Sequence, residues 1–374
     1  MAVYLDFNAS TPVLPNVLDA MIDVYRNHFG NASSRTHIYG QDAKRLVDDA
    51  RRKIAEVLGV NYTDIIFTSG ATESNNLAIQ GMAAYGRETG KTHIVTSVIE
   101  HSSVLEPIRM LQSQGFEVDY VPVDKSGRID PSTLLSRVRK DTMLVSVMHA
   151  NNETGIIQPV EEIGEALSDM GVFFHVDASQ SFGKLIQSLR KTQYDLLSCT
   201  AHKVYGPQGI GALVTRQKRY RRPPLKPILY GGGHERGLRP GTLPVALIVG
   251  FGVAAETCLR EHENWTEQFR AVRNQILKQL ERVHYAVNGD QRYCLDNCIN
   301  VSFPGVDSEA LMMAVRDSLA LSNGSACTSS EYRPSHVLEA MGCLAECAIR
   351  ISWGPQISTV NLEPLLSFVA QVAG

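Results

Sequence analysis

A lysine that follows a buried strand is the residue in this chain whose surroundings say most about chemistry. Lys203 ends the run Ser198-Cys-Thr-Ala-His-Lys203, directly after the apolar segment Tyr194–Leu197. A lysine held there can lose its proton and form an imine with an aldehyde. A second apolar segment, Val172–Val176, ends in Asp177, whose carboxylate could pair with a pyridinium nitrogen. A lysine that forms an imine and an aspartate that pairs with the ring nitrogen are the groups that a protein supplies to the cofactor pyridoxal 5'-phosphate (PLP).

Cys327 is a second candidate for chemistry because of the segment around it. The run Leu321-Ser-Asn-Gly-Ser-Ala-Cys-Thr-Ser-Ser330 is polar and contains a glycine. A thiol in such a loop is expected to be exposed, as a working nucleophile must be. From the pattern alone, an exposed thiol without a chemical role remains the simpler interpretation.

The other cysteines carry no such signal. Seven cysteines in a chain of 374 residues argue against a disulfide framework. Two pairs have a spacing of four residues but form no CxxC motif, so we expect small buried side chains and no metal site. These cysteines are Cys199, Cys258, Cys294, Cys298, Cys343 and Cys347.

Length and composition exclude several classes of protein. A chain of 374 residues is long enough for a sizeable core and two domains. Its net charge of −3 gives it no overall attraction to nucleic acid or to a membrane surface. No apolar run reaches the length of a membrane span, and the first residues lack a basic-then-apolar signal, so we expect a cytoplasmic protein.

The segments that must position these residues alternate between strand and helix patterns over the first two-thirds of the chain. Apolar spacing from Arg35 to Leu58 predicts an amphipathic helix that stops at Gly59. Such alternation is typical of an α/β fold with a mostly parallel seven-stranded sheet and helices on both faces. The expected strands are Ile65–Phe67, His93–Val98, Phe116–Val123, Met143–Met148, Val172–Val176, Tyr194–Leu197 and Gly211–Val214.

The last third predicts a smaller α+β domain. We place the large domain at residues 15–260, and the small domain at residues 1–14 and 261–374 with Cys327 in it. The basic stretch from Arg216 to Pro227 is expected to be a linker or surface loop. The later elements expected are a helix from Val245 to about Val283, a strand at Cys298–Phe303, helices at Asp307–Leu319 and near Ser335–Met341, a strand at Ala348–Trp353 and a closing helix.

Further candidates follow other strand ends, where an open α/β sheet binds its ligands. In Thr68–Ser74, free N–H groups and the Thr72 hydroxyl can hold a phosphate at a helix N-terminus, although a plain capped helix start is the alternative. His101 could lie flat on an aromatic ring or be a surface histidine. Side-chain amides in Asn151–Gly155, and that of Gln180, could bind a phenolic oxygen. The alternative for Asn151–Gly155 is a turn without a binding role.

With these motifs in this order, the sequence resembles the cysteine desulfurases of the NifS/IscS kind, which are PLP enzymes of the class V aminotransferase family. The two motifs most specific to that group are Gly231–Pro244 and Gly324-Ser-Ala-Cys-Thr-Ser329. The resemblance covers nearly the whole chain and implies the PLP-dependent transferase fold of type I. The other matching segments are Tyr4–Pro12, Phe29–His37, Thr68–Ser74, Glu100–His101, Asn151–Glu153, Asp177–Gln180 and His202–Lys203.

The resemblance implies a role for each matching residue. Lys203 would bind PLP and carry protons, Asp177 would keep the pyridine nitrogen protonated, and His101 would stack on the ring. Asn152 and Gln180 would lie at the phenolic oxygen. The phosphate would be bound by Ala71, Thr72, Thr200, His202 and, from the neighbouring subunit of a homodimer, Thr242.

The resemblance also implies the reaction. Arg350, with Asn152, would bind the carboxylate of L-cysteine by a bidentate pair. A Cys327 thiolate would attack the substrate sulfur, leaving L-alanine and a persulfide that passes to an acceptor protein. Iron–sulfur assembly, thiolation and DNA phosphorothioation of the DndA kind are the candidate uses. The length from Cys327 to Pro334 favours sulfur transfer over selenocysteine cleavage.

Some positions depart from that group, and other functions remain open. Ala32 stands where proline is frequent, Pro240 where serine is frequent, and Ser352-Trp-Gly-Pro-Gln356 lacks a positive charge near Arg350, which points to a specialised member. An ordinary PLP aminotransferase or lyase needs no thiol at Cys327. A non-catalytic sulfur-trafficking scaffold is the third possibility, and it would not need Lys203, Asp177 and His101 together.

The stretch Arg216–Arg222 is the one feature that could point to nucleic acid, since it is basic with a single aromatic residue. A surface loop, or a contact with the acceptor protein, is the favoured interpretation. Because the chain as a whole is slightly acidic, we expect contact with nucleic acid at most indirectly, through a partner.

Overall fold

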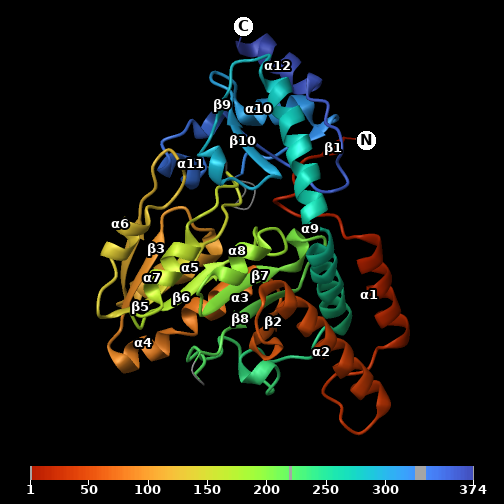
Figure 1. Ribbon diagram of the computed structural model, residues 1–374, viewed down its shortest axis with the longest axis vertical. Coiled ribbons are helices and arrows are strands. Elements are labelled where there is room, and N and C mark those ends of the chain that lie inside the picture. Colours follow the sequence, from red (N-terminus) through yellow and green to blue (C-terminus); the bar gives the residue numbers. More distant parts are fainter. Residues whose placement is uncertain (1, 219–220, 325–333, 374) are drawn as a thin grey trace.

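The computed structural model describes residues 2–218, 221–324 and 334–373, so Cys327 lies outside the described residues. A large α/β part holds a wide sheet, and a smaller α+β part lies above it in Figure 1. The long helix α9 (Val245–Leu280) runs from one part into the other. Among the described residues no helix is long and apolar enough to cross a membrane, and the expected cytoplasmic location stays a prediction.

The large sheet has the expected seven strands, of which only β8 runs against its neighbours. β6 is paired in parallel with β5 and with β7, so the carboxyl ends of these central strands meet at one edge. The mostly parallel seven-stranded sheet is therefore confirmed. In spatial order the strands are β2 (Ile65–Thr68), β8 (Gly211–Thr215), β7 (Leu196–Thr200), β6 (Phe173–Asp177), β5 (Thr142–Met148), β3 (His93–Ser97) and β4 (Glu117–Val121).

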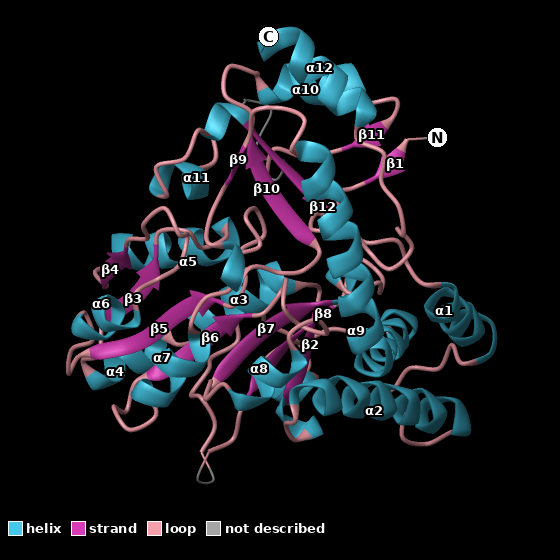
Figure 2. Cartoon of the chain, turned by 45° about the horizontal axis from the view of Figure 1, so that its top comes forward, coloured by secondary structure: helices cyan, strands magenta, loops and turns pink. Residues whose placement is uncertain are grey.

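Helices cover both faces of this sheet, which explains why its central strands are apolar almost throughout (Figure 2). Alternate residues of a strand point to opposite faces. Leu197 packs in one core with α2, α7 and α8, whereas Leu196 packs in another with α3 and α5. The helices of this part are α1 (Pro15–Asn27), α2 (Ile38–Leu58), α3 (Ala71–Gln80), α4 (Ala83–Thr89), α5 (Ser102–Ser113), α6 (Pro131–Ser136), α7 (Val160–Leu167) and α8 (Ile186–Lys191).

Two elements of the large part, α2 and β7, show why observed boundaries differ from the expected ones. Helix α2 begins at Ile38 rather than Arg35, because the His37 ring caps it by accepting from the backbone N–H of Gly40; it ends, as expected, at Gly59 with φ of 66°. β7 begins two residues later than expected and continues to Thr200. Its polar last residues still pair with β8, which apolar spacing alone cannot reveal.

The smaller part has a core of its own, in which Leu5 joins residues between Phe269 and Val369. The expected helix Asp307–Leu319 ends at Val315, since Leu319 pairs instead with Val3. Trp265 of α9 packs against both this core and that of the large part, and the division at residue 260 stays a prediction. The elements here are β1 (Val3–Tyr4), β9 (Ala286–Val287), β10 (Cys298–Ser302), α10 (Ser308–Val315), β11 (Leu319–Ala320), α11 (His336–Ala340), β12 (Ala348–Ser352) and α12 (Glu363–Ala373).

Candidate active site

Asp177 is the last residue of β6 and lies at the centre of the strand-end edge. Only 5% of it is exposed. One carboxylate oxygen accepts from the backbone N–H and the hydroxyl of Ser179, at 2.9 and 2.5 Å. The other accepts from the Asn75 amide at 2.8 Å. A carboxylate with donors on both oxygens is held in one orientation, as an ion partner for a ring nitrogen must be.

Lys203 lies on the neighbouring strand end, in the single turn Ala201–Lys203 that follows β7. Its ammonium group donates to the backbone carbonyls of Asn8 and Ala9, the second at 2.7 Å. The N-terminal segment after β1 therefore comes up to the end of β7. A lysine amine at this strand end can form an imine with an aldehyde once it has lost its proton.

The charges of Asp177 and Lys203 both affect the pKa of His101, in opposite directions. Burial lowers the pKa of its imidazole; the Asp177 carboxylate raises that pKa and the Lys203 ammonium lowers it. The ring caps α5, where Nδ1 accepts from the backbone N–H of Ser103 at 3.1 Å and lies 2.8 Å from its hydroxyl. A neutral, fixed imidazole is suited to stacking on an aromatic ring.

Asn75 ties this cluster together, and sequence reasoning missed it. The same amide nitrogen that bonds Asp177 also donates to the Ser103 hydroxyl at 2.8 Å. It therefore links the end of β6 to the start of α5. The available signal was a polar residue on the apolar face of α3, four positions before Ile79.

The residues expected to bind phosphate lie around the start of α3. Gly70 caps this helix with φ of 156°, a conformation that essentially only glycine adopts, and Ala71 and Thr72 form the first turn. The Thr200 hydroxyl lies 3.0 Å from Nδ1 of His202. Burial, helped by the Lys203 charge, lowers the pKa of His202 to about 4, so its ring is neutral near pH 7.

A cavity of about 470 Å³ opens beside this helix start, between α3 and α5. Thr72 and His101 both line it, so the expected phosphate and ring sites share one space. Backbone N–H groups at a helix N-terminus favour an anion at that end of the cavity.

Further polar groups meet around Asn8, whose carbonyl accepts from Lys203 and which sequence reasoning also missed. The Gln180 amide donates to the Asn8 carbonyl at 2.8 Å, while the Gln180 side-chain oxygen is buried with no partner among the described residues. The Asn8 amide donates to the backbone carbonyl of Asn152 at 3.2 Å. The half-buried Asn152 and the buried Gln180 thus both lie beside Asn8.

Arg350 enters this site from β12 of the smaller part. Its guanidinium donates to the Asn152 carbonyl at 2.9 Å and forms an ion pair with Asp6 at 2.5 Å. Only 3% of Arg350 is exposed, and its Nε has no partner among the described residues. Asp6, a residue the sequence did not single out, is therefore the carboxylate that Arg350 binds in this structure.

Thr242 is exposed, in the segment between β8 and α9. Several side chains of this segment bond residues of the large part. Glu235 forms a bidentate pair with Arg51 at 2.7 and 2.8 Å, and Arg239 bonds Glu73 of α3 at 3.0 Å. Cys327 lies outside the described residues, so its expected role stays a prediction.

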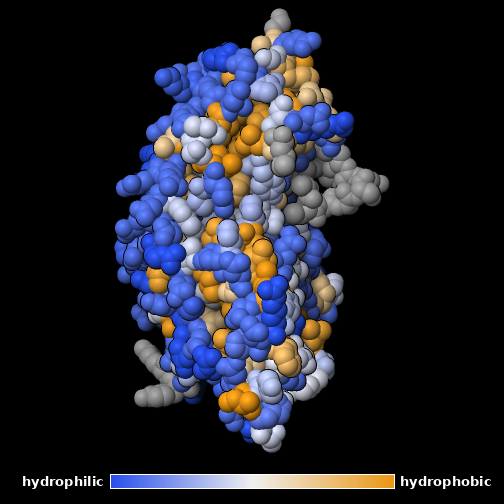
Figure 3. Space-filling model, turned by 90° about the vertical axis from the view of Figure 1, so that its right-hand side faces the viewer, coloured by the Kyte–Doolittle hydropathy of each residue, from blue (hydrophilic) through white to orange (hydrophobic). Residues whose placement is uncertain are grey.

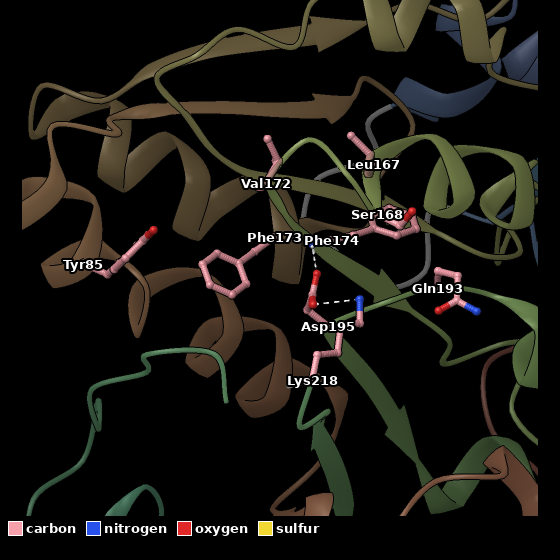
Figure 4. A pocket seen from close by; sticks show the side chains of 10 residues that line it. Tyr85, Leu167, Ser168, Val172, Phe173, Phe174, Gln193, Asp195 and Lys218 are labelled. Carbon is pink, nitrogen blue, oxygen red and sulfur yellow. Dashed lines mark hydrogen bonds and ion pairs between the residues drawn. The ribbon is translucent and has the colours of Figure 1, made fainter. Parts of the chain in front are cut away.

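A second, smaller pocket lies at the opposite edge of the sheet (Figure 4). It lies where β6 begins, between Phe173 and Gln193, and none of the expected site residues that the structure describes lines it. Asp195 there accepts from the backbone N–H of Phe174 at 2.9 Å and pairs with Lys218 at 2.9 Å. Arg222 pairs with Asp64 in the same way. Two of the positive charges of the basic stretch, on Lys218 and Arg222, are therefore paired with carboxylates of the same chain.

Comparisons with known proteins agree with this geometry. Residues 3–365 match the family model described as aminotransferase class-V. The cysteine desulfurase IscS of Anaeromyxobacter sp. (strain Fw109-5) is 46% identical over 376 residues, covering 99% of this chain and 92% of that protein. The crystal structure of DndA from Streptomyces lividans is 45% identical with a TM-score of 0.83, covering 94% and 100% of the two chains. SspA in complex with cysteine is 37% identical with a TM-score of 0.80, covering 94% and 99%.

Proposed function

The chain belongs to the class V aminotransferase family and is a cysteine desulfurase, and we propose that Lys203, Asp177 and Cys327 carry its reaction with PLP as the cofactor. The observation that supports this most is the meeting of three groups at neighbouring strand ends. Asp177 ends β6, and Lys203 follows β7, which pairs with β6 in parallel. Asn75 bonds Asp177 and Ser103, and Ser103 in turn bonds the His101 ring.

The residues present fit PLP group by group. The helix start at Ala71 and Thr72 suits a phosphate, with the Thr200 hydroxyl and the neutral His202 beside it. The side-chain oxygen of Gln180 is buried without a partner among the described residues, which fits the phenolic oxygen of the ring. PLP would supply an electron sink that weakens the carbon–sulfur bond of the bound cysteine.

The protein's own groups would then orient the substrate and move its protons. Asp177 would hold the proton on the ring nitrogen, and the Lys203 amine would remove the proton from the substrate α-carbon and return protons later. Arg350 would bind the substrate carboxylate in place of Asp6, with the Asn152 side chain beside it.

Sulfur transfer needs a nucleophile, which we assign to Cys327. Its thiolate attacks the substrate sulfur, so that a sulfur–sulfur bond forms as the carbon–sulfur bond breaks. The electron pair of the broken bond stays on the substrate carbon, which takes up a proton and leaves as alanine. Overall, one thiol and one cysteine give one persulfide and one alanine, and no external oxidant is needed.

A homodimer would complete the phosphate site through Thr242 of the second subunit. The turn between α1 and α2 exposes apolar side chains, among them Phe29, 71% exposed, which stacks on Tyr39 at 5.6 Å. Figure 3 shows apolar residues at the lower end of this face, where this turn lies in Figure 1, and others across its middle and upper part. Such a patch suits a contact with a second copy of this chain.

The persulfide sulfur would pass to an acceptor protein. SspA was solved with cysteine, which supports cysteine as the substrate of this chain. The IscS relative and the DndA structure are 46% and 45% identical to this chain, so iron–sulfur assembly and DNA phosphorothioation are both retained as uses.

The roles of Lys203 and Cys327 can be tested separately. Borohydride treatment of the PLP-loaded protein should fix the cofactor on the Lys203 peptide, and Lys203→Ala should abolish that mass. With L-cysteine and a thiol reductant, Cys327→Ser should lower alanine formation by about 100-fold or more, because a transition-state bond is lost. Alanine or pyruvate formation at the wild-type rate by Cys327→Ser would instead establish an aminotransferase or lyase.

A further inference from the structure

Glu153 lies between the two described ends that flank residues 325–333, the segment that contains Cys327. Its Oε2 accepts a hydrogen bond from the hydroxyl of Ser335, on the far side of the segment. On the near side is Gly324, with φ of 86°, where a Cβ would lie 2.7 Å from that same oxygen. One carboxyl group therefore contacts both ends.

The Glu153 side chain projects from a rigid support. Its backbone N–H donates to the Asn151 side chain at 2.9 Å, and its carbonyl accepts from the Asn300 amide of β10 at 3.0 Å. The preceding carbonyl, of Asn152, is bonded by Arg350 and by Asn8. Glu153 is therefore fixed relative to the residues that we assign to cofactor and substrate binding.

Both ends are also tied to the site independently of Glu153. Ser322 exchanges backbone hydrogen bonds with Arg350, and its hydroxyl accepts from the N–H of Gly324 at 3.1 Å. His336, after Ser335, lies 3.1 Å from the Glu100 carbonyl, next to His101. Glu153 adds a side chain that packs against Gly324 and bonds Ser335.

We propose that Glu153 is a positioning residue for sulfur transfer: by joining Gly324 to Ser335 it fixes where the Cys327 segment begins and ends beside the bound substrate. This inference rests on the proposed role of Cys327. It assigns Glu153 to the transfer step and not to cysteine binding, because the side chain faces the two segment ends.

What Glu153 supplies to Ser335 is a hydrogen-bond acceptor, which a neutral side chain can also supply. Burial raises the pKa of Glu153 to about 7, against the opposing effects of the Ser335 hydroxyl and the Arg350 charge. Glutamine has the same shape and keeps a side-chain oxygen for Ser335, so Glu153→Gln should preserve the link. Glu153→Ala should remove it, and Ser335→Ala should remove it from the other side.

The test compares two steps in the PLP-loaded enzyme. Stopped-flow absorbance after mixing with L-cysteine follows substrate binding, and mass analysis of acid-quenched samples follows persulfide on the Cys327 peptide. Glu153→Ala should slow persulfide formation about tenfold or more, with Ser335→Ala in the same direction, since each leaves a buried group unpaired. The absorbance step should change less than about twofold in these variants, and Glu153→Gln should restore transfer to within about threefold of wild type.

Glu165→Ala, at an exposed position of α7, is the matched control and should behave as wild type in both steps. Equal slowing of both steps by Glu153→Ala would mean a general structural role and would overturn the inference, as would transfer at the wild-type rate. If Glu153→Ala does not fold, Ser335→Ala and Glu153→Gln decide by the same criteria. Wild-type enzyme that forms alanine without sulfur on Cys327 would overturn the proposed function itself, and the inference with it.

Discussion

Single buried polar residues determine how the site is held. Asp177 is oriented by Ser179 and Asn75, and Asn75 in turn fixes the start of α5 through Ser103. The catalytic candidates Lys203 and Asp177 could be predicted from their place after apolar strands. Asn75, Asn8 and Glu153 could not, because their importance comes from partners distant in the sequence, which spacing does not show.

Glu100, beneath the site, makes a prediction about pH at this scale. Its Oε1 accepts from the Ser97 hydroxyl and the Met148 N–H, and Oε2 is buried without a partner among the described residues. Burial raises the pKa of Glu100 to about 8, with the Asp177 charge adding to the effect. Glu100 is therefore protonated in the folded enzyme at neutral pH, whereas an unfolded glutamate is ionised.

The sign of the effect follows from linkage. Below about pH 4.3 the Glu100 carboxyl is protonated in both the folded and the unfolded chain. As the pH rises from there to about 8, it loses its proton only in the unfolded chain, so the free energy of unfolding falls. Glu100→Gln should remove this fall, on the order of 3 kcal/mol between pH 5 and 8. Denaturant unfolding at both pH values checks it; an identical pH dependence in the variant would contradict it.

At the scale of elements, the alternation of apolar runs predicted every strand of the large sheet, because strands covered on both faces must be apolar. The boundaries failed where polar residues continue an element. β7 extends to Thr200 because its backbone pairs with β8 and the Thr200 hydroxyl is satisfied by the Ile210 carbonyl and His202. Likewise, α10 ends early because Leu319 has a strand partner in Val3.

The close approach of β8 to the phosphate turn provides a test at this scale. A Cβ on Gly211 would lie 2.7 Å from both the Gly70 Cα and the Cys199 carbonyl, which are backbone atoms that cannot move aside cheaply. Gly211→Ala should therefore displace the start of α3 and weaken PLP affinity about tenfold or more. Gly233→Ala, with no atom within 4 Å of its Cβ, is the control. Unchanged cofactor affinity of Gly211→Ala, measured by fluorescence titration, would argue against this account of the phosphate site.

At the scale of the whole molecule, the site lies where the two parts of the chain meet. Arg350 comes from the smaller part, Asp177 and Lys203 from the larger, and the segment after β1 supplies Asn8 between them. Such a site depends on how the parts pack, which sequence patterns define least well. The resemblance to a known family, rather than periodicity, is what anticipated Arg350 and Thr242.

The homodimer is the prediction that belongs to this scale. Light scattering after gel filtration should give twice the chain mass, and Phe29→Asp with Tyr39→Asp should give the mass of one chain, because charges would replace the exposed apolar pair. The monomer should also bind PLP more weakly, since Thr242 of the second subunit would be missing. Met313→Asp, at an exposed apolar residue of the smaller part, should remain dimeric. A wild-type monomer that binds PLP fully would contradict the shared site.

The central claim is that Cys327 takes sulfur from cysteine, and mass mapping of cysteine-containing peptides tests it most directly. After incubation of the PLP-loaded enzyme with L-cysteine, the account predicts one added sulfur, removable by a reductant, on the Cys327 peptide and on none of the other six cysteines. Alanine formation with Cys327 unmodified would contradict it.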